Sequence, residues 1–136
     1  MTLDNSHIRY KARFDQFQSF ANLKFGNLRP IDIDGFMEIH NKLFIFIESK
    51  TFDAPFSTGQ RIALERLTDA IAADPNKHAF TIIARHNTPV DETVDTGNSL
   101  VHTYRYDRMW IDISMLEYTV HDFIESLINT YIYNTK

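Results

Sequence analysis

The order of apolar and polar residues along the chain predicts a mixture of strands and helices. Residues 31–39 alternate between acidic and apolar side chains, as expected of a strand with one exposed face. Residues 43–47 are almost all apolar, as expected of a strand covered on both faces. Residues 40–42 form a polar turn between these two strands. Further strands are predicted at residues 78–85, which are rich in β-branched side chains, and at residues 100–106.

Three helices are predicted, at about residues 4–23, 58–73 and 115–132, because apolar side chains recur there at intervals of three and four. A serine followed three residues later by glutamine or glutamate, the capping-box pattern, opens the second and third helices: Ser57 with Gln60, and Ser114 with Glu117. The apolar stripes are Tyr10, Phe14, Phe17 and Ala21 in the first helix, Ile62, Ala63, Leu67, Ala70 and Ile71 in the second, and Leu116, Val120, Phe123, Ile124, Leu127 and Tyr131 in the third.

Length and composition limit the class of protein. With 136 residues the chain has the length of one domain, so we expect residues 1–136 to share a single core. The absence of cysteine excludes disulfides, thiolate metal sites and thiol nucleophiles. No apolar run is long enough to span a membrane, and the first residues lack the apolar segment of a signal peptide. We therefore expect a cytoplasmic protein with no membrane partner.

The predicted hairpin carries the candidate chemistry. Asp32 and Asp34 lie on one face of its first strand, and its second strand ends in Glu48 and, two residues later, Lys50. A hairpin that brings an aspartate beside Glu48 and Lys50 places two carboxylates and an ammonium group at one point, where a hard cation can bind. Either Asp32 or Asp34 can supply the first carboxylate. We favour Asp34 because it is nearer to Glu48 in sequence and because Gly35 after it allows the strand to bend.

Asp34 followed by Glu48-Ser49-Lys50 resembles the core motif of the PD-(D/E)XK nuclease superfamily, which includes many restriction enzymes, Holliday-junction resolvases and RecB-type exonucleases. In that family the aspartate comes from one strand of a hairpin and the acid-x-lysine from the next. Ile33 before Asp34 matches the RecB-like variant, and the resemblance covers about residues 28–67. It implies an α/β fold: a mixed central β-sheet flanked by helices, with a restriction-endonuclease-like αβββαβ core and a C-terminal helix.

The resemblance also implies a deoxyribonuclease that hydrolyses phosphodiester bonds with Mg²⁺ or Mn²⁺. Asp34, Glu48 and the backbone carbonyl of Ser49 would bind the metal ion, which would activate a water molecule for attack on the scissile phosphate. Lys50 would position that water and offset negative charge in the transition state. The expected partner is DNA, and a domain this small that cuts both strands would act as a homodimer.

In the family, two helices supply further residues to this site. Many members carry a glutamate on the first helix, and here Asp15 and Gln16 are the nearest polar residues. Several families carry a glutamine near the start of the second helix that touches the substrate, and Gln60 stands in the corresponding place. The capping box explains Gln60 equally well, so both interpretations stay open.

Four arginines are candidate contacts for nucleic-acid phosphates: Arg61, Arg66, Arg105 and Arg108. The formal net charge of −4 argues against DNA binding by bulk electrostatics. Two other interpretations follow. One is a nuclease-fold accessory protein of phage or anti-defence type that binds nucleic acid or protein without cutting, which the missing glutamate and the acidic balance favour. The other is an α/β protein that binds a partner through the aromatic segment at residues 104–110.

Overall fold

The structure of the chain is a computed structural model that describes residue 16 and residues 18–134. The chain divides into two compact units, Met1–Asp32 and Ile33–Lys136. In the first unit, residues 18–23 are not helical, so the predicted first helix does not extend to residue 23. The earlier part of that helix lies outside the described residues, and one domain over residues 1–136 stays a prediction.

The second unit is built on a five-stranded mixed sheet. In spatial order its strands are β1 (Gly35–Ile39), β2 (Leu43–Thr51), β3 (His78–His86), β4 (Leu100–Tyr106) and β5 (Met109–Asp112). Strands β2 and β3 are parallel, and all other neighbours are antiparallel. A parallel pair needs a crossover connection, which helix α2 (Thr58–Ala72) provides.

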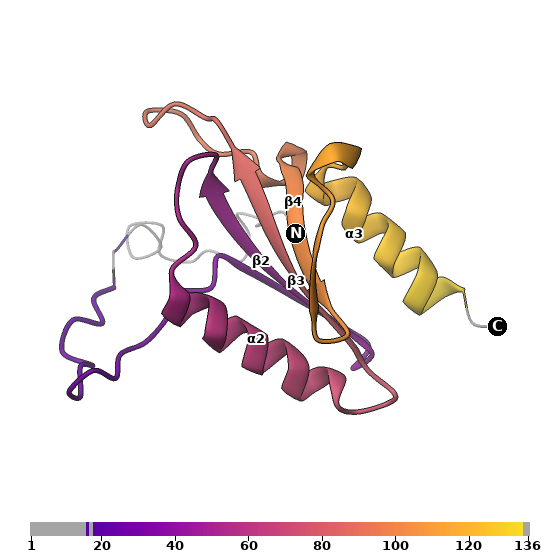
Figure 1. The fold of residues 1–136 in the computed structure, drawn as a ribbon, viewed down its shortest axis with the longest axis horizontal. Helices are drawn as coiled ribbons and strands as arrows, with labels where there is room; N and C mark the ends of the chain where they lie inside the picture. Colours follow the sequence, from indigo (N-terminus) through magenta and orange to yellow (C-terminus); the bar gives the residue numbers. More distant parts are fainter. Residues whose placement is uncertain (1–15, 17, 135–136) are drawn as a thin grey trace. The chain divides into compact units, whose positions relative to one another are not determined.

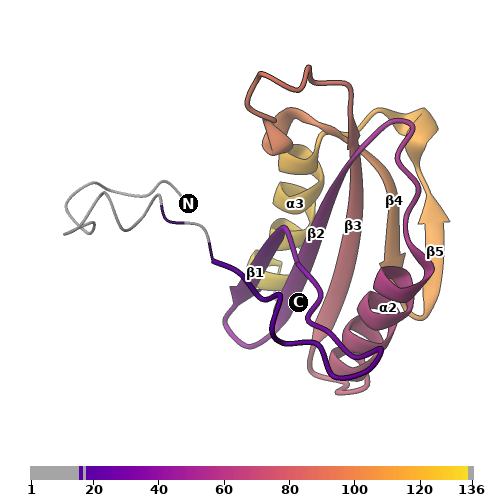
Figure 2. The ribbon, with the colours of Figure 1, turned by 90° about the vertical axis from the view of Figure 1, so that its left-hand side faces the viewer.

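Helices α2 and α3 (Val120–Ile128) cover opposite faces of the sheet (Figures 1 and 2). Tyr104 and Arg105 are adjacent in β4, so their side chains point to opposite faces. Tyr104 packs against Phe123 of α3 with ring centroids 4.9 Å apart, whereas Arg105 bonds to Asp69 of α2. The predicted α/β class, with a mixed sheet flanked by helices and a C-terminal helix, is confirmed.

Short turns join β1 to β2 and β4 to β5. Residues 40–42 connect β1 to β2, with positive φ at His40 (52°) and Asn41 (57°), and Asp107 (φ 51°) and Arg108 (φ 64°) connect β4 to β5. Positive φ at both central residues is the type I′ geometry, whose twist matches that of the strands it joins. The predicted polar turn at residues 40–42 is confirmed, with the Lys42 amide donating to the carbonyl of Ile39 at 2.9 Å.

The main apolar core lies between the sheet and the C-terminal segment. Its buried members are Leu43, Ile45, Phe80, Ile82, Ala84, Val101, Ile113, Val120, Ile124, Leu127 and Ile132. Of the stripe predicted for the last helix, Leu116 is wrong, because its side chain is 59% exposed. Residues Asn129–Tyr133 continue α3 as a short π-helix that buries Ile132.

The predicted start of the last helix is also wrong. The helix begins at Val120, where the Thr119 side chain accepts a hydrogen bond from the Asp122 amide at 3.1 Å. Backbone bonds hold the preceding residues in an extended conformation beside β4: Val101 donates to Tyr118 and Val120 donates to Ser99. These tertiary bonds compete with the local helix signal at Ser114, whose hydroxyl bonds to Asp112 instead of capping a helix.

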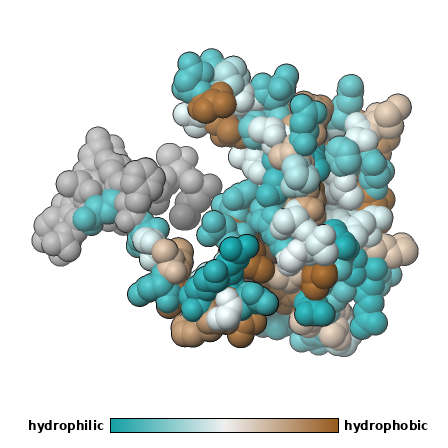
Figure 3. Space-filling view, turned by 60° about the vertical axis from the view of Figure 1, so that its left-hand side comes forward, coloured by the Kyte–Doolittle hydropathy of each residue, from teal (hydrophilic) through white to brown (hydrophobic). Residues whose placement is uncertain are grey.

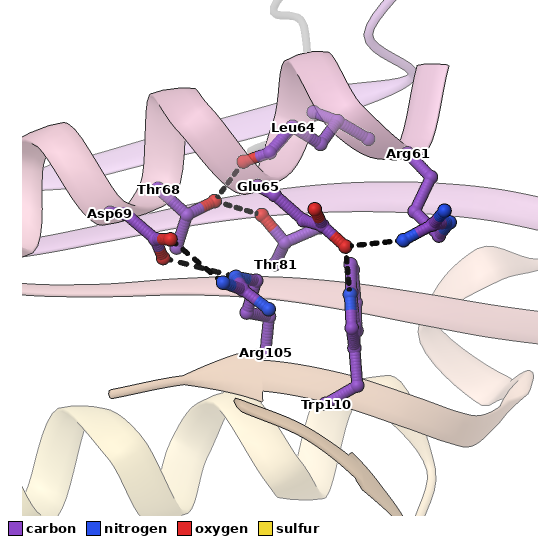
Figure 4. A network of polar contacts seen from close by, with 8 residues as sticks. All are labelled: Arg61, Leu64, Glu65, Thr68, Asp69, Thr81, Arg105 and Trp110. Carbon is purple, nitrogen blue, oxygen red and sulfur yellow. Dashed lines mark hydrogen bonds and ion pairs between the residues drawn. The ribbon is translucent and has the colours of Figure 1, made fainter. Parts of the chain in front are cut away.

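Polar contacts hold α2 against the face of the sheet that is opposite to the α3 side (Figure 4). Thr68 is 1% exposed, and its hydroxyl lies 2.6 Å from the carbonyl of Leu64 and 2.5 Å from the Thr81 hydroxyl. Since the single hydroxyl proton of Thr68 is donated to Leu64, Thr81 is the donor in the second bond. Glu65 accepts a hydrogen bond from the indole of Trp110 at 2.7 Å. These bonds set the position of α2 along the strands.

Apolar side chains also reach the surface of the second unit. Phe36 in the edge strand β1 is 54% exposed and stacks on Phe46, with ring centroids 4.8 Å apart. On the face drawn in Figure 3, brown patches are separated by teal and white residues. The exposed apolar area there is divided into small patches, as is common on protein surfaces.

Candidate metal and catalytic site

The candidate site lies where β2 ends and β1 begins. Glu48 is in the last part of β2, an inner strand of the sheet, and is 1% exposed, which is unusual for a carboxylate. Gly35 pairs with Ile47 in the antiparallel hairpin, so Asp34, one residue before β1, stands opposite Glu48. The type I′ turn at the other end of the hairpin sets this register.

Reciprocal hydrogen bonds join these two acids. The backbone amide of Asp34 donates to Oε1 of Glu48 at 3.2 Å, and the backbone amide of Ser49 donates to Oδ2 of Asp34 at 2.8 Å. Both carboxylates are thereby held by the backbone of the opposite strand. The structure brings Asp34 and Glu48 together as predicted, whereas Asp32 belongs to the other compact unit.

Gln60 reaches the same point from the first turn of α2. Its side-chain amide donates to Oε2 of Glu48 at 2.7 Å. The Ser57 hydroxyl accepts a hydrogen bond from the Gln60 backbone amide at 3.2 Å, so the serine half of the capping box is present as well. The backbone of Gln60 thus serves the helix cap, while its side chain belongs to the site, which combines the two interpretations left open by the sequence.

Lys50 lies on the same face of β2 as Glu48, two residues further on. It is half-buried, and its Nζ lies 5.8 Å from the centroid of the Phe56 ring. Lys50 is near enough to Glu48 to counteract part of the burial effect on that carboxyl group. The three residues of the predicted motif are therefore on one face at one end of the hairpin.

The electrostatics of the site favour a bound positive charge. Burial, and then the neighbouring carboxylate of Asp34, raise the pKa of Glu48, while the Asp34 amide, Lys50 and Gln60 act in the opposite direction. The net direction is upward, so the positive groups of the chain do not fully compensate the two adjacent acids. A proton on Glu48 or a cation between the acids relieves this imbalance.

The donor set suits a cation that keeps most of its water ligands. Within residue 16 and residues 18–134, no group of three or more aspartate, glutamate, histidine or cysteine residues is arranged to hold a metal ion. Two carboxylates with one carbonyl meet the needs of Mg²⁺, which commonly binds one or two protein carboxylates plus waters and phosphate oxygens. Ser49 can contribute only its backbone carbonyl as a ligand, because its side chain points to the other face of β2. Asp15, a predicted substitute for the family's helical glutamate, lies outside the described residues, and Gln16 is exposed and not helical.

The four candidate arginines fall into different environments. Arg61 follows Gln60 on α2, has a 43% exposed side chain and pairs with Glu65 at 2.7 Å. Arg66 is exposed further along the same helix. Arg108 lies in the β4–β5 turn, and because β4 runs antiparallel to β3, that turn is at the end of the sheet away from Glu48. Arg61 is therefore the candidate nearest to the carboxylate pair.

Arg105, unlike the other three, is buried in an ion pair. It is 8% exposed, and its guanidinium group makes two hydrogen bonds to Asp69, from Nε at 3.0 Å and from Nη2 at 2.7 Å (Figure 4). The carboxylate of Asp69 raises the pKa of Arg105. The forked geometry of this pair matches its donors to both carboxylate oxygens, so Arg105 links β4 to α2.

Phe56 and Arg85 are site residues that the sequence analysis missed. Arg85 is paired with Lys50 across the parallel β2–β3 ladder. Its Nη1 donates to the carbonyl of Thr51 at 2.9 Å and to that of Ala54, and so holds the loop between β2 and α2. The signal in the sequence is weak, because the register of two parallel strands joined by a helix is not set by a local turn.

The aromatic segment at residues 104–110 is divided between the two faces of the sheet. Tyr104 and Tyr106 pack on the α3 side, where the Tyr106 ring stacks on Phe80 with centroids 4.3 Å apart. Burial raises the pKa of Tyr106 to about 12, consistent with a neutral, packed side chain. Trp110 lies on the α2 side with Glu65, so the segment does not present its three aromatic rings as one surface.

No protein-family model, curated protein or solved structure matches this chain. None of the helices in the described part of the chain has the length and apolar character needed to cross a bilayer.

Proposed function

We propose that this protein is a deoxyribonuclease of the PD-(D/E)XK type that depends on a divalent metal ion. The observation that supports the proposal is the pairing of Asp34 with Glu48 at the end of one hairpin, with the Gln60 side chain bonded to Glu48 and Lys50 two residues further along the same face of β2. Two hard oxygen donors beside an ammonium group match the needs of phosphodiester hydrolysis, which requires a cation site and a group that offsets charge on the phosphate.

Each side chain has a distinct role in this mechanism. Asp34, Glu48 and the Ser49 carbonyl would hold Mg²⁺ or Mn²⁺, which when bound would supply a water of lowered pKa and charge neutralisation at the phosphate. Lys50 would orient the attacking water and stabilise the negative charge that grows on the phosphate oxygens. Gln60 holds the Glu48 carboxylate through Oε2. Because backbone amides already fix both carboxylates, the site needs little reorganisation to act.

The proposed activity has a direct test in gel assays on linear, circular and four-way-junction DNA with Mn²⁺. We expect Glu48→Gln and Lys50→Met to lower the cleavage rate by on the order of 10²- to 10³-fold, the usual effect of deleting a group that stabilises the transition state. Glu38→Gln and Lys77→Met are the matched controls. Glu38 also bonds a backbone amide in the hairpin, and Lys77 also lies over an aromatic ring, but neither is at the site.

The controls should cut at the rate of the unchanged protein. Cleavage by Glu48→Gln or Lys50→Met at that same rate would contradict the assignment. Circular DNA separates internal cutting from cutting at ends, and sedimentation of the protein with and without DNA tests the predicted homodimer.

A second candidate is a nuclease-fold protein that binds nucleic acid or a protein partner without cutting. It is supported by the two-carboxylate donor set in the described residues and by the net charge of −4. Such a protein would be stabilised by Mn²⁺ or would retain DNA in a gel-shift assay, and would leave all three DNA substrates intact.

A further inference from the structure

A small pocket lies beside the catalytic lysine, on the face of the sheet that α2 covers. Its volume is about 190 Å³, and the rings of Phe56 and Trp110 are two of its walls. Their centroids are 6.1 Å apart with the ring planes at 77°. Pockets for drug-sized ligands measure roughly 300–1,000 Å³, so this one suits a single flat group.

The pocket is next to the proposed reaction centre. The Phe56 ring that forms its wall is the ring over which Nζ of Lys50 lies, at 5.8 Å. Arg61, which also lines the pocket, is the residue after Gln60, whose side chain bonds to Glu48. A nucleotide whose phosphate is bound by Lys50 and by the metal ion that Glu48 would hold therefore has its base, or that of a neighbour, within reach of this pocket.

The polar lining suits a nucleic acid. Arg61, Arg85 and His102 contribute to the lining, and none of the described lining residues is acidic, although the chain as a whole is negatively charged. The register of β3 and β4 shifts between Ile83 and Ala84, which leaves His102 without a partner across the ladder. Both His102 and its neighbour Thr103 line the pocket. Bulges of this kind re-aim side chains near functional sites.

Trp110 is held in place rather than free to move. Its indole nitrogen donates to Glu65 at 2.7 Å, and the guanidinium carbon of Arg105 lies 5.6 Å from the ring centroid (Figure 4). Glu65 in turn pairs with Arg61. A preorganised aromatic wall loses little conformational entropy when a ligand stacks on it.

We infer that this pocket binds one unpaired nucleobase of the DNA next to the scissile phosphate, so that the substrate of the proposed nuclease is single-stranded DNA or a DNA end or branch with unpaired bases. The inference rests on the proposed function for the position of the phosphate. Bases in an intact duplex are stacked on one another and are not available to an aromatic pocket. Stacking of an unpaired base on aromatic side chains needs no particular base sequence.

The test uses Trp110, the only tryptophan in the chain, as a fluorescent reporter. Three ligands are titrated in EDTA, so that no metal-dependent cleavage occurs: a short oligothymidylate, an abasic strand of the same length, and a blunt hairpin duplex. We expect oligothymidylate to quench Trp110 and to bind about 5- to 150-fold more tightly than the abasic strand, the factor that corresponds to one stacked base. Equal affinity for the abasic strand, or for the blunt duplex, would overturn the inference.

Two phenylalanine variants provide the second measurement. Phe56→Leu should weaken oligothymidylate binding by a factor in the same range, whereas Phe52→Leu should leave it unchanged, because Phe52 is exposed in the same loop but lines a different pocket. An unchanged dissociation constant in Phe56→Leu would contradict the inference. Quenching without Mn²⁺-dependent cleavage would support the base pocket and refute the proposed nuclease activity. Cleavage with no preference for unpaired bases would support the nuclease activity and refute the base pocket.

Discussion

The pair formed by Arg105 and Asp69 provides a sharp test of how α2 is attached to the sheet. Replacing Arg105 with Met keeps much of the length of the side chain but leaves the Asp69 carboxylate without its two donors. Removing one partner of a fully buried pair costs about 3–5 kcal/mol. The side chain of Arg105 is 10% exposed and that of Asp69 is 26% exposed, so water compensates part of the loss. We expect Arg105→Met to lower the free energy of unfolding by about 3 kcal/mol.

Chemical and thermal unfolding measure this effect. For a chain of this size, 3 kcal/mol corresponds to a decrease in Tm of about 10 °C. The double variant Arg105→Met, Asp69→Leu should recover most of the loss, because it leaves no unpaired buried charge. Arg61→Ala is the matched control: its partner in the i, i+4 ion pair is Glu65, the two side chains are 43% and 21% exposed, and helix pairs at this spacing are worth about 0.3–0.5 kcal/mol.

The same variants decide whether Arg105 has any direct role in DNA binding. Loss of a phosphate contact reduces the slope of log affinity against log salt by about one, and a purely structural arginine leaves that slope unchanged in the folded protein. A Tm within about 1 °C of the unchanged protein together with a reduced salt slope in Arg105→Met would refute the structural role.

Two further predictions concern the site and the α2 contact. In the folded, metal-free protein the pKa of Glu48 is raised above its ordinary value of 4.5. The protein should therefore lose stability as the pH rises from 4.5 through the folded-state pKa, because over this range the unfolded chain has released the proton that the folded chain still holds. Glu48→Gln should remove this loss. Thermal melts in EDTA across the pH range measure it, and parallel curves for the two proteins would contradict the burial argument. Thr68→Val should lower the free energy of unfolding in urea by about 1–3 kcal/mol, because it leaves the buried Thr81 hydroxyl without its acceptor. Adding Thr81→Val should restore part of that loss; a double variant no more stable than Thr68→Val would show that the two hydroxyls are independent.

Local sequence patterns predicted the hairpin turn and the start of the second helix, but part of that helix's predicted apolar stripe is wrong: Leu67 is 38% exposed, and the buried side chains are those of Leu64 and Thr68. The turn at residues 40–42, the apolar strand β2 and the cap at Ser57 each depend on residues within one turn or one strand, and all three are confirmed. The start of the last helix could not be predicted in this way. Ser114 and Glu117 fit a capping box, but backbone bonds from residues 118 and 120 to strand β4 outweigh that local preference.

Two side chains show why the candidate site was only partly predictable. Gln60 and Glu48 are 12 residues apart. The sequence is compatible with Gln60 as a helix cap and as a site residue, and only the direction of its side chain decides between these interpretations. Arg105 and Asp69 are 36 residues apart, and nothing near either residue in the sequence indicates the other. An arginine in an alternating strand fits a phosphate contact and a buried ion pair equally well.

By itself, the amino-acid sequence determined the elements whose signals are local. These are the strand that ends in the acid-x-lysine motif, the neighbouring strand of the hairpin with Asp34 beside it, and the helix that follows. Periodicity and turn chemistry act over a few residues, so they can be read without knowing the fold. Only the tertiary structure decided which charged side chains are buried, which strand pairs with Lys50, and that Phe56 meets Trp110. Those contacts join residues far apart in the chain, and their identity depends on strand register and on how α2 lies across the sheet, which no short segment encodes.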